Sequence, residues 1–143
     1  MNQKRINDWI PTAIAVLNEI GINKKKDKDG NEVEIPVPKA FKGYFSAFGA
    51  AVVQSGMLPA VIFFENDTGR TEADRPQVIK AVFKLLKKKL LIPGTATNGL
   101  TAYLLESANR QKELQKPIVE AAIALKIALR TFKIEKDQSN ESE

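Results

Sequence analysis

Two residue types that carry much of protein chemistry are missing from the chain, which has no cysteine and no histidine. Without cysteine it cannot form disulfide bonds, thiolate metal sites or a thiol nucleophile. Without histidine it lacks the commonest general base and the commonest transition-metal ligand, and its serines and threonines have no imidazole partner for a catalytic triad. These absences exclude thiol catalysis, histidine acid–base catalysis, and metal sites built from thiolates or imidazoles.

Long uninterrupted apolar runs are also missing. The most apolar stretch, FGAAVVQSGMLPAVIFF at residues 48–64, is interrupted by Gly56 and Pro59, whereas a membrane helix needs about 20 consecutive apolar residues. The N-terminus, MNQKRINDW, is not followed by the apolar run and small-residue cleavage site of a secretion signal. We therefore expect a cytoplasmic protein with no membrane partner.

The remaining composition is that of an ordinary globular protein. Hydrophobic residues make up 43% of the 143 positions and charged residues 27%, which counts against disorder. A chain of this length forms one domain and buries about two-thirds of the surface that its unfolded form exposes. We expect a single helical domain over residues 1–133 and a polar, acidic tail over residues 134–143 that frays.

Apolar spacing and breaker residues predict an all-α fold, a compact bundle of about five to six helices. Asp8 can cap a first helix, with Pro11 in its first turn and Gly21 at its end. The charged segment 23–38 contains an Asp-Gly pair and apolar alternation, a pattern that allows a short hairpin near residues 27–35.

Longer helical patterns follow this segment. Residues 39–65 predict two helices or one kinked helix, interrupted near Gly56, with Pro59 suited to the first turn of a new segment. The remaining predicted helices are 75–91, 100–115 and 118–132, of which the last two are either separate or continuous through Pro117.

The helix predicted over residues 75–91 has two contrasting sides. At about 100° per residue, one broad face is apolar, with Val78, Ile79, Val82, Phe83, Leu86 and Leu90. The opposite side carries four cations, Lys80, Lys84, Lys87 and Lys88. One side is therefore expected to pack and the other to face solvent or an anionic partner.

The last predicted helix is apolar on two sides. A heptad-like stripe is formed by Ile118, Ala122, Leu125, Leu129 and Phe132. Three cations lie beside it, Lys126, Arg130 and Lys133. A second stripe contains Ile123, Ile127 and Ile134. Such a helix is either sandwiched inside the fold or covered by a partner.

Charge is distributed unevenly along the chain. The net charge is +5, but residues 134–143 carry −3, so residues 1–133 carry +8. A basic excess of this kind suits phosphate backbones, although most lysine-rich helix faces are merely solvated. Because few aromatic residues lie among the lysines, backbone contact is favoured over stacking on single-stranded bases.

Four acids fall within ten residues, Glu65, Asp67, Glu72 and Asp74. Two of them could hold a magnesium ion in a nuclease, but turn and N-cap roles explain them better. The stretch DKDGNEVE has its glycine two places too early for a calcium loop, and GTATNG lacks the lysine of a phosphate-binding loop. We therefore expect no metal, no cofactor and no catalytic residue.

Two segments together resemble a known family. FKGYFSAFGAAVVQSGMLPAVIFF at residues 41–64 and IVEAAIALKIALRTF at residues 118–132 are similar to the small helical subunit, the fifth, of the Cmr (type III-B) CRISPR effector complexes. Their order and separation also fit, and the resemblance covers residues 39–133. The chain departs from the family in the charged segment 23–38 and in the acidic loop 66–74.

The resemblance implies a non-enzymatic structural subunit of an RNA-guided machine that targets foreign RNA. Family members are compact helical proteins that stack on one another as an inner filament, with a basic surface along the guide and target RNA, while other subunits carry the cleavage chemistry. The implied partners are therefore other subunits of the complex, copies of the chain itself, and guide and target RNA.

The site residues follow from combining this resemblance with the patterns above. Residues predicted to contact the RNA backbone are Lys80, Lys84, Lys87, Lys88, Lys126, Arg130 and Lys133. Residues predicted to contact a neighbouring subunit are Ile123 and Ile127. The core of residues 41–64 is predicted to contain Phe45, Phe48, Val52, Val53, Leu58, Val61 and Ile62. The alternatives are a stand-alone metal-dependent nuclease that uses residues 65–74, and a free nucleic-acid-binding adaptor.

Overall fold

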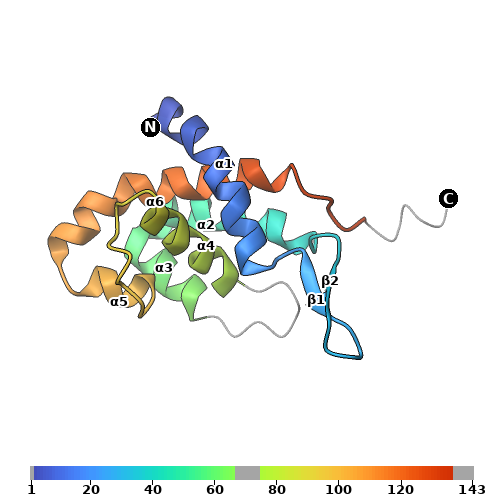
Figure 1. Ribbon diagram of the computed structural model, residues 1–143. Coiled ribbons are helices and arrows are strands. Elements are labelled where there is room, and N and C mark those ends of the chain that lie inside the picture. Colours follow the sequence, from blue (N-terminus) through green and yellow to red (C-terminus); the bar gives the residue numbers. More distant parts are fainter. Residues whose placement is uncertain (1, 67–74, 137–143) are drawn as a thin grey trace.

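The computed structural model describes residues 2–66 and 75–136. These residues form six helices and one two-stranded hairpin (Figure 1). The helices are α1 (Gln3–Ile20), α2 (Ala40–Ser55), α3 (Met57–Glu65), α4 (Pro76–Lys88), α5 (Leu100–Leu105) and α6 (Ala108–Leu129), and the strands are β1 (Lys24–Lys26) and β2 (Glu32–Glu34). The predicted all-α bundle is confirmed.

Helix α6 is the centre of the bundle, because it packs against each of the other five helices. Alanines at positions 121, 124 and 128 are fully buried, and their small side chains let neighbouring helices approach closely. The first apolar stripe of α6 is buried beside these alanines, for example at Ile118 and Leu125, whereas Ile123 and Ile127 of the second stripe are half-buried. Of the two apolar sides, the first therefore lies in the core and the second is partly covered by the chain itself.

Helix α1 starts earlier than the sequence pattern predicted. Its N-cap is Asn2, whose side-chain oxygen accepts a hydrogen bond from the Arg5 backbone N–H at 3.0 Å. The prediction that Asp8 caps the helix is therefore wrong, and Pro11 lies inside α1 on an exposed position. The predicted end is confirmed, because Gly21 has the left-handed conformation, with φ of 76°.

A buried carboxylate fastens the start of α1 to the middle of α6. Glu120 is only 2% exposed. One of its oxygens accepts a bond from the Arg5 guanidinium at 2.8 Å, and the other accepts one from the Asn2 backbone N–H at 2.8 Å. No local pattern indicates this pair, because 115 positions separate Arg5 from Glu120.

The predicted hairpin is also confirmed. β1 and β2 pair antiparallel, with Lys24 opposite Glu34. The Asp27 carboxylate accepts bonds from the backbone N–H groups of Asp29 and Asn31, both at 2.9 Å, and so closes the turn. In Figure 1 the hairpin projects away from the helices.

The chain beyond α6 returns to the segment that follows the hairpin. The Val37 N–H donates to the Lys133 carbonyl at 2.8 Å, and the Glu135 N–H donates to the Val37 carbonyl at 2.8 Å. Ile134 and Glu135, which were assigned to the polar tail, are thus held against the folded domain. Residues 137–143 of that tail lie outside the described residues.

Gly56 separates α2 from α3, as predicted, and its φ of 95° suits glycine. Within these helices the predicted core residues Phe45, Phe48, Val52 and Val61 are buried, and Leu58 is half-buried. The prediction is wrong for Val53, which is 82% exposed, and for Ile62, which is 37% exposed. Helix α3 is apolar all round, so periodicity could not identify its buried side.

The last break between helices falls earlier than expected. α5 ends at Leu105, and α6 begins after Ser107, whose backbone is extended, with φ of −159° and ψ of 128°. Helix α6 then continues through Pro117, which is buried within it. The predicted helix 100–115 is therefore wrong in its end, and the continuous alternative for the final segments is the one observed.

Helix α4 ends in a turn that usually contains glycine. Leu90 has φ of 63°. Its N–H donates to the Lys87 carbonyl at 3.0 Å, and the Leu91 N–H donates to the Leu86 carbonyl at 3.0 Å, as in a Schellman motif. Leu90 is consequently 88% exposed, and its predicted place on the apolar face is wrong. The turn leads into the loop of residues 92–99.

Replacing Arg5 with methionine should destabilise the protein more than replacing Glu120 with glutamine. Arg5→Met leaves a buried carboxylate without its cation, which we expect to lower the free energy of unfolding by about 2–3 kcal/mol, discounted because Arg5 is partly exposed. Glu120→Gln keeps one acceptor and should cost about 1 kcal/mol. Urea unfolding followed by circular dichroism measures both values.

Lys4→Met is the matched control, because Lys4 is an exposed neighbour on the same turn of α1. It should leave the free energy of unfolding within about 0.5 kcal/mol of the wild-type value. Equal stability of the Arg5→Met and Lys4→Met proteins would show that the buried pair does not fasten α1.

Candidate nucleic-acid interface

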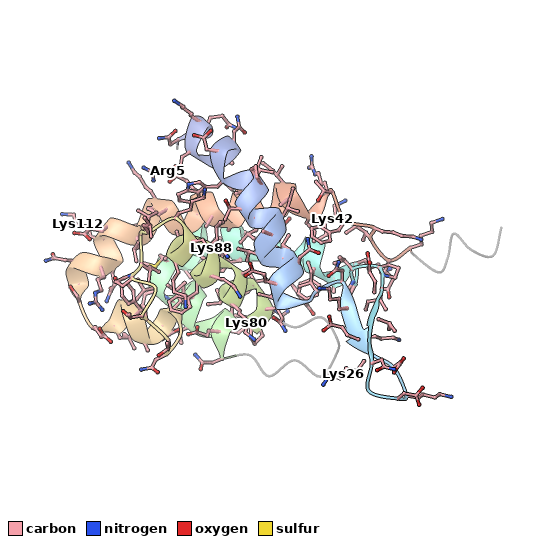
Figure 2. The ribbon with its side chains drawn as sticks, in the orientation of Figure 1. Arg5, Lys26, Lys42, Lys80, Lys88 and Lys112 are labelled. Atoms are coloured by element: carbon pink, nitrogen blue, oxygen red, sulfur yellow. The ribbon has the colours of Figure 1, made fainter. Side chains whose placement is uncertain are left out.

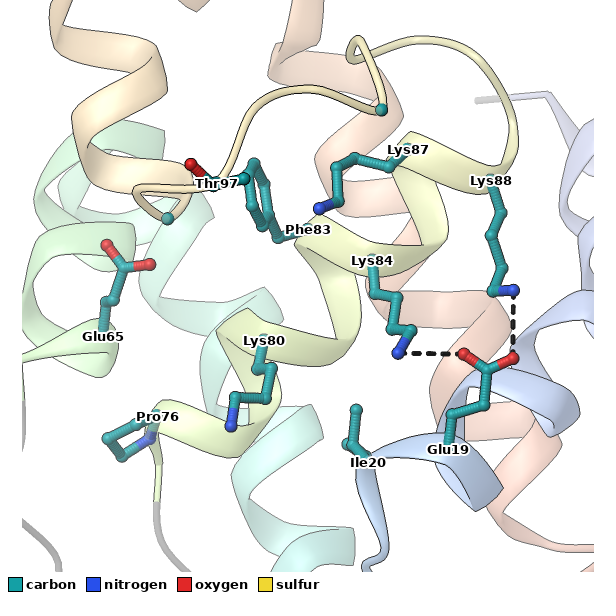
Figure 3. A pocket seen from close by; sticks show the side chains of 12 residues that line it. Glu19, Ile20, Glu65, Pro76, Lys80, Phe83, Lys84, Lys87, Lys88 and Thr97 are labelled. Atoms are coloured by element: carbon teal, nitrogen blue, oxygen red, sulfur yellow. Dashed lines mark ion pairs between the residues drawn. The ribbon is translucent and has the colours of Figure 1, made fainter.

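All four lysines of α4 line one hollow in the surface, with a volume of about 770 Å³ (Figure 3). The end of α1, the end of α3 and the loop that precedes α5 form its other walls, through residues that include Glu19, Ile20, Glu65, Gly94 and Thr97. The sequence placed these lysines on one side of a helix. The structure adds that this side lies in a concave surface built from four parts of the chain.

Packing of α4 determines which way its lysines point. Its apolar side is fully buried against the bundle, with Val78, Ile79, Ala81, Val82, Leu85 and Leu86 each at 0% exposure. α4 contacts α1, α3 and α6, so its position and rotation are fixed from several directions. Because the apolar side is held inward, the lysine side is turned toward solvent.

Phe83 and Lys87 form one wall of the hollow. Phe83 was predicted on the apolar face of the helix, and its side chain is buried, with 8% exposure. It also lines the hollow. The Lys87 ammonium lies 4.7 Å from the centre of the Phe83 ring and donates a hydrogen bond to the Ala96 carbonyl at 3.0 Å. Lys87 therefore joins α4 to the loop while its charge stays within the hollow.

Glu19, near the end of α1, pairs with two of the lysines. One carboxylate oxygen lies 2.9 Å from the Lys84 ammonium, and the other lies 3.0 Å from that of Lys88 (Figure 3). The bonds from Lys84, and then those from Lys88, hold the pKa of the Glu19 carboxyl below its usual value. Nothing in the local sequence around Glu19 signals this pairing with a distant helix.

Glu65, at the end of α3, caps the start of α5. Its two carboxylate oxygens accept bonds from the backbone N–H groups of Leu100 and Thr101, both at 2.9 Å, at the start of α5. Gly99 permits this approach, because its φ is 95° and an added Cβ would lie 2.8 Å from a Glu65 oxygen. Glu65 is therefore a cap, as the sequence favoured, although of a helix far along the chain.

The other three acids of the predicted cluster, Asp67, Glu72 and Asp74, lie outside the described residues. Within residues 2–66 and 75–136, no three acidic side chains gather as a metal site would require. Glu65, the one member of the cluster that is described, has both carboxylate oxygens bonded to backbone N–H groups.

The cations at the end of α6 lie elsewhere. Lys126 and Arg130 line a small hollow together with Lys42 of α2, and this hollow shares no residue with the α4 hollow. Lys42 also lies apart from Lys80 in Figure 2. Lys133 lines a third hollow, beside the end of the hairpin. The seven predicted RNA contacts are thus divided among three places, and only the α4 group is concentrated.

Ile123 and Ile127, the predicted subunit contacts, are half-buried and pack against the core of their own chain. Part of each side chain remains accessible. Their contact with a neighbouring subunit stays a prediction.

No family model, curated protein or solved structure matches the chain. The resemblance to the small Cmr subunit therefore depends on the two sequence segments alone. Among the described helices, none combines the length and apolar character that crossing a membrane requires.

Replacing Glu65 with alanine should loosen the start of α5 and the loop before it. Two backbone N–H groups lose their acceptor, so we expect the free energy of unfolding to fall by about 1–2 kcal/mol. Glu113→Ala is the matched control, since Glu113 is an exposed acid on α6. Urea unfolding compares the two, and equal stabilities would contradict the capping role.

Proposed function

We propose that the protein is a non-catalytic structural subunit of a cytoplasmic type III-B CRISPR ribonucleoprotein, and that it contacts the phosphate backbone of guide or target RNA through the α4 hollow. The observation that carries the RNA contact is the gathering of Lys80, Lys84, Lys87 and Lys88 in one hollow. The proposed partners are other subunits of the complex, further copies of the chain, and the RNA.

The chemistry of the hollow suits phosphate better than bases. Ammonium groups are compact point charges that attract phosphate oxygens without reading a sequence. From Lys80 to Lys88 the helix rises by about 12 Å, a distance over which a nucleic-acid strand presents several phosphates. Sequence reading would then be left to base pairing with the guide, as in other RNA-guided complexes.

The two segments that resemble the Cmr subunit are packed together in the fold. Residues 41–64 form α2 and α3, and residues 118–132 include the second half of α6. Both α2 and α3 contact α6. The resemblance thus involves one structural unit at the centre of the bundle, which supports its use as a family signature.

The nuclease alternative receives less support. Glu65 cannot readily act as a metal ligand while both of its oxygens accept backbone hydrogen bonds, and the alternative would then depend on Asp67, Glu72 and Asp74. The adaptor alternative shares the lysine hollow and differs only in the absence of a fixed complex. RNA binding by lysine variants and purification from the host separate these possibilities.

Changing Lys80, Lys84, Lys87 and Lys88 together to glutamine should weaken RNA binding without unfolding the protein. We expect the assembled complex to bind every target RNA more weakly by a similar factor, because phosphate contacts carry no base information. The dependence of log affinity on log salt should flatten by about 0.7 for each phosphate that the variant no longer neutralises. Titration of labelled targets at several salt concentrations measures both quantities.

A combination of Lys4→Gln, Lys28→Gln, Lys112→Gln and Lys116→Gln is the matched control, because it removes the same number of positive charges from exposed lysines outside the α4 hollow. The control complex should bind as the wild type does. Unaltered affinity and salt slope in the α4 variant would mean that its lysines only support solubility.

Purification of the tagged chain from its own host tests membership of the complex. The proposal expects the other type III-B subunits to co-purify in fixed proportions, together with RNA that carries CRISPR repeat sequence. A chain that purifies alone, or with RNA of unrelated sequence and no fixed partner, would favour the free adaptor.

A further inference from the structure

The four lysines of the hollow differ in their partners. Lys84 and Lys88 are each paired with one oxygen of Glu19. Lys87 donates to a neutral carbonyl. Lys80 forms no ion pair with any acid in residues 2–66 and 75–136, and it is exposed at the edge of the hollow. The hollow therefore contains two cations that share one carboxylate and two that form no ion pair with an acid of the described residues; its second carboxylate, Glu65, is bonded to the backbone N–H groups of Leu100 and Thr101.

We infer that Glu19 is an internal counter-ion that occupies an anion position in the hollow, so that RNA phosphates engage Lys80 and Lys87 while Lys84 and Lys88 are withheld. This inference rests on the proposed function, because it concerns how the same hollow binds RNA. It identifies Glu19, which no sequence pattern singled out, as the residue that limits the strength of each contact.

The geometry of Glu19 supports this role. Its two oxygens lie 2.9 Å and 3.0 Å from two different ammonium groups, which is the arrangement that two oxygens of one phosphate would adopt between the same lysines. The bonds from the two lysines lower the pKa of the carboxyl, so it stays ionised at neutral pH. An ionised carboxylate at this place competes directly with phosphate.

The backbone around Glu19 keeps the carboxylate in place. Ile20 beside it also lines the hollow, and α1 packs against α4. Gly21 ends the helix immediately afterwards. At the far end, the bond from Arg5 to Glu120 holds α1 on α6. Glu19 is therefore presented by an anchored helix, although its side chain remains partly exposed.

The consequence for binding is a weak contact per subunit. Two available lysines release about half as many counter-ions as four, so both the affinity and its salt dependence are reduced. In a row of subunits on one RNA, weak contacts add through avidity. Binding then depends on assembly, and a single free subunit binds RNA only weakly.

Glu19→Gln tests the inference on the isolated full-length chain. The probe is a fluorescein-labelled 20-nucleotide polyuridine, titrated by fluorescence anisotropy between about 20 and 150 mM KCl. Release of Lys84 and Lys88 should raise the affinity at about 50 mM KCl by roughly tenfold or more. It should also steepen the salt slope by about 1.4, which is about 0.7 for each of two further phosphates that are neutralised.

Glu32→Gln is the matched control. Glu32 pairs with Lys24 on the hairpin at 3.8 Å, so the control removes one negative charge and releases one lysine away from the hollow. Its affinity should stay within about twofold of the wild type, because exposed charges far from the bound phosphates are screened. An equal gain in the Glu19→Gln and Glu32→Gln proteins would overturn the inference, since net charge alone would then explain both.

A second variant combines Glu19→Gln with Lys84→Gln and Lys88→Gln. It removes one negative and two positive charges, a net loss of one positive charge, and leaves Lys80 and Lys87, so it should bind within about threefold of the wild type and with a similar salt slope. A clear fall in affinity in this triple variant would overturn the inference, because it would show that Lys84 and Lys88 already contact RNA beside Glu19.

The fourfold lysine variant separates the two proposals. If it binds more weakly than the wild type but Glu19→Gln binds as the wild type does, the inference about Glu19 fails and the RNA hollow stands. If the fourfold variant binds as the wild type does, the proposed RNA contact fails together with the inference. Absence of binding by both the wild type and Glu19→Gln at the lowest salt concentration also overturns the inference.

Discussion

The fold depends on covering one helix. α6 carries apolar residues on more than one side and contacts all five other helices, because leaving either side in water would cost the hydrophobic free energy of a large area. Of the helices that cover it, α4 is strongly amphipathic and presents its polar side outward. That outward side is the row of lysines, so the basic hollow is a consequence of how the core is closed.

Two acidic residues that line the hollow form contacts within the protein. Glu65 caps α5 and so positions the loop that forms one wall. Glu19 pairs with Lys84 and Lys88. Neither contact can be predicted from the composition. Both affect how the lysines of α4 are presented to a ligand. The number of lysines on the helix therefore overstates the charge that the hollow offers to a ligand.

Local patterns predicted the fold well where one feature decided the structure. Gly21 and Gly56 ended helices because their backbones adopt positive φ, and the Asp-Gly turn formed the hairpin. The two-sided pattern of residues 75–91 placed the lysines on one side of α4. Predictions failed or stayed open where several solutions were compatible with the sequence: α3 is apolar all round, so Ile62 was misplaced, and Pro117 left both separate and continuous final helices possible.

The sequence predicted the lysine side of α4 but not the contacts that complete the site, because these contacts join residues that are far apart in sequence. Glu19 meets Lys84 and Lys88 on a helix that lies far along the chain, and Glu65 meets Leu100 across 35 positions. Such pairs depend on the packing of whole helices, and no spacing rule reports them. For the same reason the cations of α6 could not be assigned to a hollow, and the structure places them apart from the α4 group.

The central claim is that RNA lies against the α4 hollow in the assembled complex. Cross-linking of the host-purified complex to a target RNA containing 4-thiouridine, followed by mass spectrometry of the chain's peptides, tests this claim most directly. The account predicts cross-links in α4 and in the loop of residues 92–99. Cross-links confined to other surfaces of the chain, or their absence while neighbouring subunits are labelled, would contradict it.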